Sequence, residues 1–179
     1  VGTGKGAEKG ILFKGGEYLE GTHTINAVLL DKTGTVTKGK PEVTDVVEFQ
    51  NGMLDYAVSA ESASEHPLAQ AIVEYGKKQA ISIKPSEHFS AIPGHGIEAV
   101  IEGKHVLVGT RKLMKEHSID ISEHENQMAD FEKQGKTAML VAIDHQIAGI
   151  IAVADTVKES SKEAIQTLKQ MGIEVYMVT

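Results

Sequence analysis

Two short apolar runs, one near each end of the chain, stand out in its hydrophobic pattern. Residues 27–30 are continuously apolar, and residues 173–178 form a second run that only Glu174 interrupts. Runs of this kind are typical of strands buried on both faces, as in a parallel sheet. The first run ends at Asp31 and the second at Thr179. A polar residue at the carboxyl end of such a strand lies in the crevice where open α/β sheets place ligands.

The chain between these runs has a different pattern, with alternating strands and amphipathic helices. Pro67 is well placed at the first position of one helix, which makes His66 its predicted N-cap. Residues 122–125 (Ser-Glu-His-Glu) form a predicted capping box that opens another helix. The pattern predicts a strand over 42–49, hairpins over 99–108 and 138–153, and helices over 54–61, 67–75, 111–117, 122–134 and 157–171.

The simplest architecture for this pattern is one domain inserted into another. The outer runs predict a parallel α/β domain, and the middle predicts an α+β insert with an antiparallel sheet. Residues 1–21 are rich in Gly and Lys and predict a connecting segment with a short helix at 17–20. Residues 37–41 predict a turn at the boundary. The expected divisions are 1–23, 24–41, 42–154 and 155–179.

Composition limits the classes of function. Net charge is −7, from 18 basic and 25 acidic residues, which argues against a nucleic-acid partner. There is no cysteine, so a disulfide framework and a thiolate metal site are excluded. No apolar run approaches the ~18 residues of a membrane span, which predicts a soluble chain. Because the chain starts at Val1 and stops in an apolar run, we expect it to belong to a longer protein.

The segment directly after the first apolar run carries the most specific chemistry. Asp31 is followed by Lys32, Thr33, Gly34 and Thr35. Asp and Thr favour turns, so an Asp at a strand end is by itself most simply read as part of a capped turn. An exposed carboxylate can also act as a nucleophile toward phosphate when a divalent cation and nearby donors offset the charge.

A second candidate site begins at residue 64. His66 and Glu65 lie at a predicted helix start, where backbone N–H groups and the positive end of the helix dipole are available. A histidine there is most often only a cap or a solvated side chain. Farther along, Gly94 and Gly96 lack Cβ atoms and would let a flat base or a phosphate approach the backbone. The alternative reading is a plain turn at the entry to a strand. A dinucleotide fingerprint is rejected, because the following residues predict a hairpin rather than a helix.

The string of residues 31–35 resembles the phosphorylation signature of the P-type ATPases. Residues 64–67 (Ser-Glu-His-Pro) resemble the signature of their heavy-metal-transporting branch, and Glu61 matches that branch's adenine-site Glu. The resemblance covers essentially the whole chain. It implies an incomplete haloacid-dehalogenase-like, Rossmann-like phosphorylation domain with an inserted nucleotide-binding domain. Lys158, three residues after Asp155, resembles the family's second hinge, whereas Thr110 departs from the family's Gly-Asn pair.

The resemblance also implies roles for particular residues. Asp31 would accept the γ-phosphoryl group of ATP, with Lys32, Thr33 and Thr179 orienting the phosphoryl oxygens. Mg²⁺ would be held in part by the Asp31 carboxylate and the Thr33 carbonyl. The residues that would hold the nucleotide are Glu61, His66, Gly94, Gly96, Ile97 and Gly109.

The implied whole protein is a membrane-embedded pump for a heavy metal, copper(I) first, with this chain at the cytoplasmic face. Its partners would be ATP, the membrane, actuator and metal-binding domains of the same protein, and a metallochaperone. We expect the chain alone to bind ATP weakly and to turn it over poorly.

Two other functions compete with the pump. A soluble haloacid-dehalogenase-type phosphatase is disfavoured, because such enzymes generally carry a second Asp where this chain has Thr33. A non-catalytic nucleotide-binding module would need no phosphoryl acceptor at Asp31.

Overall fold

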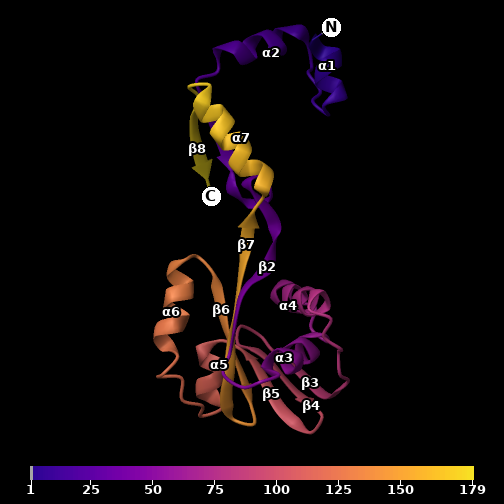
Figure 1. Cartoon of the computed structure of the whole chain (residues 1–179), viewed down its shortest axis with the longest axis vertical. Helices are drawn as coiled ribbons and strands as arrows, with labels where there is room; N and C mark the ends of the chain where they lie inside the picture. The colour runs from indigo at the N-terminus through magenta and orange to yellow at the C-terminus, as the bar shows by residue number, and fades with distance from the viewer. Residues whose placement is uncertain (1) are drawn as a thin grey trace. The chain divides into compact units, whose positions relative to one another are not determined.

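The computed structural model describes residues 2–179, which divide into two compact units. The terminal unit comprises the chain up to Lys38 together with Val157–Thr179, and the middle unit is Gly39–Thr156. Two long strands, β2 (Thr37–Glu48) and β7 (Gln146–Val157), carry the chain between the units (Figure 1).

The terminal unit is built around two parallel strands. β1 (Ala27–Asp31) pairs with β8 (Glu174–Val178), and Asp31 lies opposite Val178. The sequence prediction of two parallel strands is therefore confirmed. α7 (Glu159–Gln170) connects β7 to β8 and ends before Gly172, whose φ is +77°. Its first turn is tied to the other half of the unit, because the Ser161 hydroxyl donates to the Val36 carbonyl at 2.9 Å.

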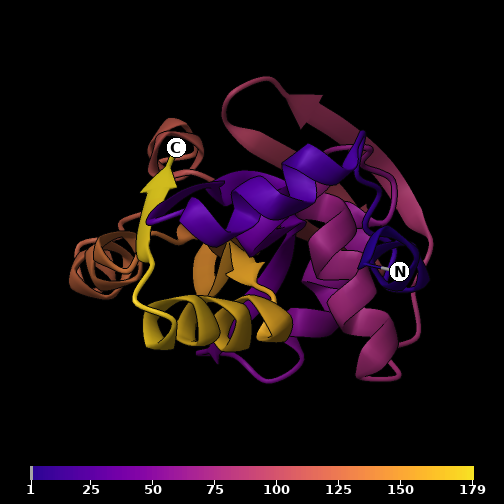
Figure 2. The same cartoon turned by 90° about the horizontal axis from the view of Figure 1, so that it is seen from above.

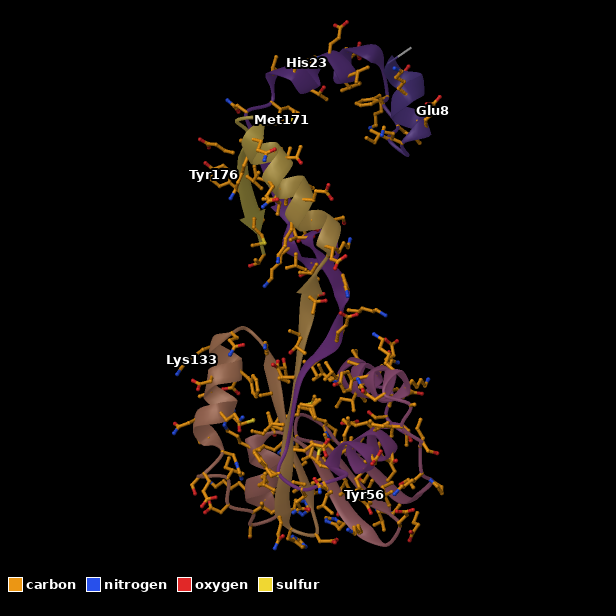
Figure 3. All side chains as sticks on the ribbon, in the orientation of Figure 1. Glu8, His23, Tyr56, Lys133, Met171 and Tyr176 are labelled. Carbon is orange, nitrogen blue, oxygen red and sulfur yellow. The ribbon has the colours of Figure 1, made fainter. Side chains whose placement is uncertain are left out.

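The prediction that these strands are buried on both faces is wrong. The exposed fraction is 69% for Leu29, 53% for Tyr176 and 59% for Met177. Figure 3 shows Tyr176 on β8 and Met171 at the end of α7 pointing outward. The physical reason is that the sheet has two strands among the described residues, too few to be covered on both faces.

The N-terminal segment also differs from expectation. α1 (Gly2–Glu8) occupies part of the predicted connecting segment, despite its three glycines. α2 (Gly16–Gly21) confirms the short helix expected at 17–20, and a 3₁₀ turn, η1 (Thr22–Thr24), follows it. Neither α1 nor α2 buries a residue, so no apolar periodicity marked them in the sequence.

The middle unit is a six-stranded sheet with helices on both faces, in the strand order β2-β7-β6-β5-β4-β3. The pairs from β3 to β7 are antiparallel, and two of them, β4–β5 and β6–β7, are the hairpins predicted over 99–108 and 138–153. The remaining strands are β3 (Ser86–Ile92), β4 (Gly96–Ile101), β5 (Lys104–Gly109) and β6 (Thr137–Ile143), and the helices are α3 (Met53–Glu61), α4 (Pro67–Lys78), α5 (Arg111–Glu116) and α6 (Glu125–Lys133).

Alternation along the strands divides the middle unit into two apolar cores. Val106 and Val108 of β5 pack in the core that contains α3 and α4, whereas Leu107 packs with Met114 of α5 and Met128 of α6. Successive strand residues point to opposite faces, which explains this division. Figures 1 and 2 show α4 and α6 on opposite sides of the strands.

Two local predictions in the middle unit need correction. The expected turn at 37–41 is part of β2, where the Gly39 N–H donates to the Asp155 carboxylate at 2.9 Å. Pro41 is tolerated there because β2 is an edge strand, where the missing N–H breaks no interior ladder.

The expected capping box at 122–125 is also wrong. The Ser122 N–H and hydroxyl both donate to the Asp120 carboxylate at 3.0 Å. α6 therefore begins at Glu125, and its N-cap, His124, makes no side-chain capping bond. Over residues 2–179, no helix is long and apolar enough to cross a membrane.

Candidate functional site

One pocket of about 330 Å³ in the middle unit collects the residues that the sequence proposed for a nucleotide. They come from α3, from the turn before α4, and from the facing ends of β4 and β5. That a nucleotide binds in this pocket is a prediction. The lining contains all six proposed residues: Glu61, His66, Gly94, Gly96, Ile97 and Gly109.

His66 is held at the mouth of α4 by its own helix. It is the N-cap, and its Nδ1 accepts the Leu68 N–H at 3.2 Å, as the predicted cap requires. Its backbone N–H donates to the Ser64 hydroxyl at 3.3 Å. Because Nδ1 is the acceptor, Nε2 carries the proton and is available as a donor. The Leu68 N–H, in the first turn of α4, thus fixes one tautomer and one orientation of the imidazole.

Glu61 is a buried carboxyl group, only 5% exposed, at the end of α3. Burial raises the pKa of Glu61 to about 7, and a hydrogen bond with Ser64 opposes the shift. Removing a carboxylate from water disfavours its charged form, which accounts for the direction. Near neutral pH, Glu61 can therefore present either a donor or an acceptor to a polar group in the pocket.

Gly96 and Gly109 let two strands approach closely at the pocket. They are paired across β4 and β5, and the φ of Gly96 is +141°. A Cβ at Gly96 would lie 2.1 Å from the Val108 carbonyl oxygen, and one at Gly109 would lie 2.2 Å from the His95 carbonyl oxygen. Both glycines are thus required by strand packing as well as by the open pocket. Gly94, with φ +72° and open space around it, is required only by its backbone conformation.

Several lining residues were not proposed from the sequence. Thr137 and Met139 enter from β6, far along the chain, and no local pattern marks them. His95 was treated as the variable residue between two glycines. Its Nδ1 bonds the Pro93 carbonyl at 2.8 Å, and its Nε2 bonds Glu116 of α5 at 3.2 Å.

Thr110, the departure from the family's Gly-Asn pair, has a structural role. It is the N-cap of α5, and its hydroxyl accepts the Leu113 N–H at 3.5 Å. The residue also lines the pocket, so it positions the start of α5 beside Gly109.

The second candidate site lies in the terminal unit, at the carboxyl ends of β1 and β8. Asp31 ends β1 and is exposed, and Lys32 and Thr33 follow it. Thr179 follows Val178, the partner of Asp31 on the neighbouring strand. The structure therefore brings the four proposed catalytic residues to one edge of a parallel sheet. Their roles are a prediction.

The conformation of the loop after Asp31 is held by residues outside the string at 31–35. Thr37 is 1% exposed, and its hydroxyl accepts the Gly34 N–H at 3.2 Å and donates to the Lys32 carbonyl at 3.1 Å. The Lys158 ammonium donates to the Gly34 carbonyl at 2.9 Å. Gly34 itself has φ +79°, which favours glycine. The buried Thr37 hydroxyl was missed in the sequence because its role depends on this turn.

The oxygen atoms at this edge suit Mg²⁺, which prefers carboxylate, carbonyl and water ligands. The Asp31 carboxylate and the Thr33 carbonyl supply such donors. Among residues 2–179, no three His, Cys, Asp or Glu side chains are gathered to hold a metal ion. The Asp31 carboxylate and the Thr33 carbonyl would therefore hold Mg²⁺ only in part.

The parallel sheet, the Asp at a strand end and the inserted antiparallel domain together point to one class of proteins. Residues 25–179 match the haloacid dehalogenase-like hydrolase family, and the chain belongs to that family.

Within this class, the resemblance to metal-transporting P-type ATPases is confirmed. The chain is 52% identical over 180 aligned residues to a copper-exporting P-type ATPase of Staphylococcus aureus (strain JH9), covering 100% of the chain and 22% of that protein. The structure is similar to that of a zinc-transporting PIB-type ATPase in an E2.Pi state, with a TM-score of 0.91 and 32% identity over 99% of the chain and 29% of that protein. It is also similar to the catalytic domain of the CPx-ATPase CopB-B, with a TM-score of 0.66 and 26% identity over 98% of the chain and 62% of that domain. The chain thus spans about a fifth of the length of the curated relatives it matches.

Proposed function

We propose that the chain is the ATP-binding and autophosphorylation region of a heavy-metal pump that works through an aspartyl-phosphate intermediate. The observation that carries this proposal is the convergence of six residues, chosen from separate motifs, on one pocket. The 52% identity with a copper-exporting P-type ATPase supports copper as the transported ion.

In this proposal, the pocket of the middle unit holds the adenine of ATP. The lining is largely apolar around Ile97 and the glycines, which suits the flat face of a base. Glu61 and His66 supply the polar groups that give orientation. The bond at Nδ1 already fixes the direction of the Nε2–H of His66. Little side-chain entropy is therefore lost when the ring binds the base.

The chemical step is a phosphoryl transfer to Asp31. A carboxylate oxygen of Asp31 forms a bond to the γ-phosphorus as the bond to the β-γ bridging oxygen breaks, and ADP leaves with that electron pair. Lys32, Thr33 and Thr179 orient the phosphoryl oxygens, and the Lys32 ammonium offsets part of their charge. Water then hydrolyses the acyl phosphate, which releases phosphate and restores the Asp31 carboxylate.

Mg²⁺, when bound at the Asp31 carboxylate and the Thr33 carbonyl, supplies positive charge that offsets repulsion between carboxylate and phosphate. Thr37 and Lys158 keep the Thr33–Gly34 turn in place through their bonds to Lys32 and Gly34. These bonds would position the Thr33 carbonyl, which would hold the cation.

The whole protein in this proposal is membrane-embedded, with the chain on the cytoplasmic side. ATP is its small-molecule partner, and the membrane, actuator and metal-binding domains of the same protein are its macromolecular partners. A metallochaperone that delivers the ion is a further partner in this proposal.

A titration with a non-hydrolysable ATP analogue tests the nucleotide role. We expect the backbone amide signals of residues 64–66, 68 and 94–97 to shift in NMR spectra of the chain, whereas Asp31→Asn leaves the affinity for the analogue unchanged. Shifts that avoid the pocket, or no binding at millimolar analogue, would refute the adenine assignment.

A further inference from the structure

Residues 93–96, at the junction of β3 and β4, form one wall of the pocket, and all four of them line it. His95 is the residue of this loop that has a polar side chain, because its neighbours are a proline and two glycines. The His95 N–H donates to the Ile92 carbonyl at 3.0 Å, and the His95 carbonyl accepts the Thr110 N–H at 2.8 Å. The glycines bring no side-chain contacts, so the polar side-chain contact that ties this wall to the rest of the unit comes from His95.

The His95 side chain bonds both its own loop and α5. Its Nδ1 lies 2.8 Å from the Pro93 carbonyl oxygen, and its Nε2 lies 3.2 Å from a carboxylate oxygen of Glu116. Both partners are acceptors, so a ring nitrogen that makes either bond must donate, and the two bonds coexist in the imidazolium form. The His95 side chain is 16% exposed and that of Glu116 is 49% exposed. The ring is thus mostly enclosed, whereas its partner lies at the surface.

Glu116 is well placed to affect the loop without touching a ligand. Among the described residues, the lining of the pocket includes His95 but not Glu116. An ion pair as exposed as this one adds little to the stability of a fold. It can still restrict a loop, and a loop that is already held in its binding conformation loses less entropy when the ligand binds.

We propose that the bond between His95 and Glu116 is a positioning contact, which holds the loop at 93–96 in the conformation that receives the base. This inference rests on the nucleotide role proposed for the pocket. α5 is a firm anchor for such a contact, because Thr110 caps its first turn and Leu113 is fully buried. The loop is therefore tied to a fixed part of the middle unit.

Calorimetric titration of the whole chain with a non-hydrolysable ATP analogue tests this role. We expect Glu116→Ala to weaken binding about three- to fivefold, which is the size of effect that one exposed ion pair allows. Loss of a negative charge would by itself favour an anionic nucleotide, so a weakening points to the position of the loop. Glu116→Gln keeps an acceptor oxygen and should restore the affinity to within about twofold of the unmodified chain. Glu123→Ala, which removes an exposed acid in the turn before α6, is the control of equal charge and should not weaken binding.

Two further readouts separate a positioning role from a merely structural one. In a His95→Ala background, Glu116→Ala should change the affinity for the analogue by less than about 1.5-fold, because the contact is already lost. In the chain without nucleotide, the amides of His95 and Thr110 should exchange hydrogen about three- to fivefold faster in Glu116→Ala.

The positioning role is overturned if Glu116→Ala binds the analogue as tightly as the unmodified chain, if the two amides exchange at unchanged rates, or if Glu116→Ala weakens binding equally with and without His95. In each of these cases the analogue still binds, so the nucleotide role of the pocket stands. If the unmodified chain binds no analogue, the nucleotide role itself fails, and the positioning role fails with it.

Discussion

At the scale of single residues, the pocket depends on the protonation of two side chains, each controlled by its neighbours. Glu61 is buried at the end of α3, and burial raises its pKa to about 7. His66 is fixed in one tautomer by the N–H of Leu68. These contacts let Glu61 act as a donor or an acceptor, depending on pH. They make His66 a donor with a fixed direction.

The raised pKa of Glu61 predicts a loss of stability at alkaline pH. The folded chain binds this proton more tightly than the unfolded chain does, so the stabilisation is complete below pH 4.5 and is lost as pH rises through about 7. Between pH 5 and pH 8.5, we expect the free energy of unfolding to fall by up to about 3 kcal/mol more than in Glu61→Gln. Urea denaturation followed by circular dichroism measures the difference. Parallel pH profiles for the two proteins would contradict a raised pKa.

Replacing His66 by Gln should weaken ATP binding roughly tenfold, or about 1.4 kcal/mol, because the ring and its directed N–H are lost. His124→Gln is the control, since His124 stacks on Phe49 and does not line the pocket. Affinities come from calorimetry, with circular dichroism to check that both variants fold. An unchanged affinity of His66→Gln for ATP would mean that the His66 ring does not help to bind the adenine.

At the scale of elements, the site depends on close approaches that single side chains cannot provide. β4 and β5 meet at Gly96 and Gly109, where their backbones nearly touch. The loop after Asp31 is similarly held from within, by the buried hydroxyl of Thr37. In both places, the backbone conformation is part of the site.

Gly96→Ala should therefore destabilise the chain by about 3 kcal/mol or more, because the new Cβ would lie 2.1 Å from the Val108 carbonyl oxygen at φ +141°. Gly103→Ala is the matched control, with φ +74° and open space around the Cβ, and should cost about 1 kcal/mol. Urea unfolding of both variants gives the comparison. Equal costs would mean that the close strand contact does not matter.

The elements that the sequence predicted correctly are those whose signals are local. The apolar run before Asp31, Pro67 after its cap, and the turn at Glu102–Gly103 each determine an element through adjacent residues. Elements whose form depends on distant partners were missed. β2 continues through Pro41 only because it lies at a sheet edge. The start of α6 was missed for a local reason, because Ser122 bonds Asp120, two residues before it, instead of capping the helix.

At the scale of the whole molecule, the sequence motifs predicted where the chemistry lies but not everything that surrounds it. Six proposed residues do line one pocket, because their motifs flank elements that pack together. The lining from β6, at Thr137 and Met139, follows from sheet order, which local periodicity does not encode. The burial of β1 and β8 was overestimated because it depends on how many strands join the sheet.

The central claim is that Asp31 becomes phosphorylated by ATP, and a chimaera tests it most directly. The chain would replace the matching segment of the Staphylococcus aureus copper-exporting P-type ATPase, to which it is 52% identical. After incubation with Mg²⁺ and γ-labelled ATP, we predict an acid-stable, hydroxylamine-labile label that is absent from the Asp31→Asn chimaera. A label of equal strength in both chimaeras, or none in the Asp31 chimaera while the parent pump is labelled, would contradict the account.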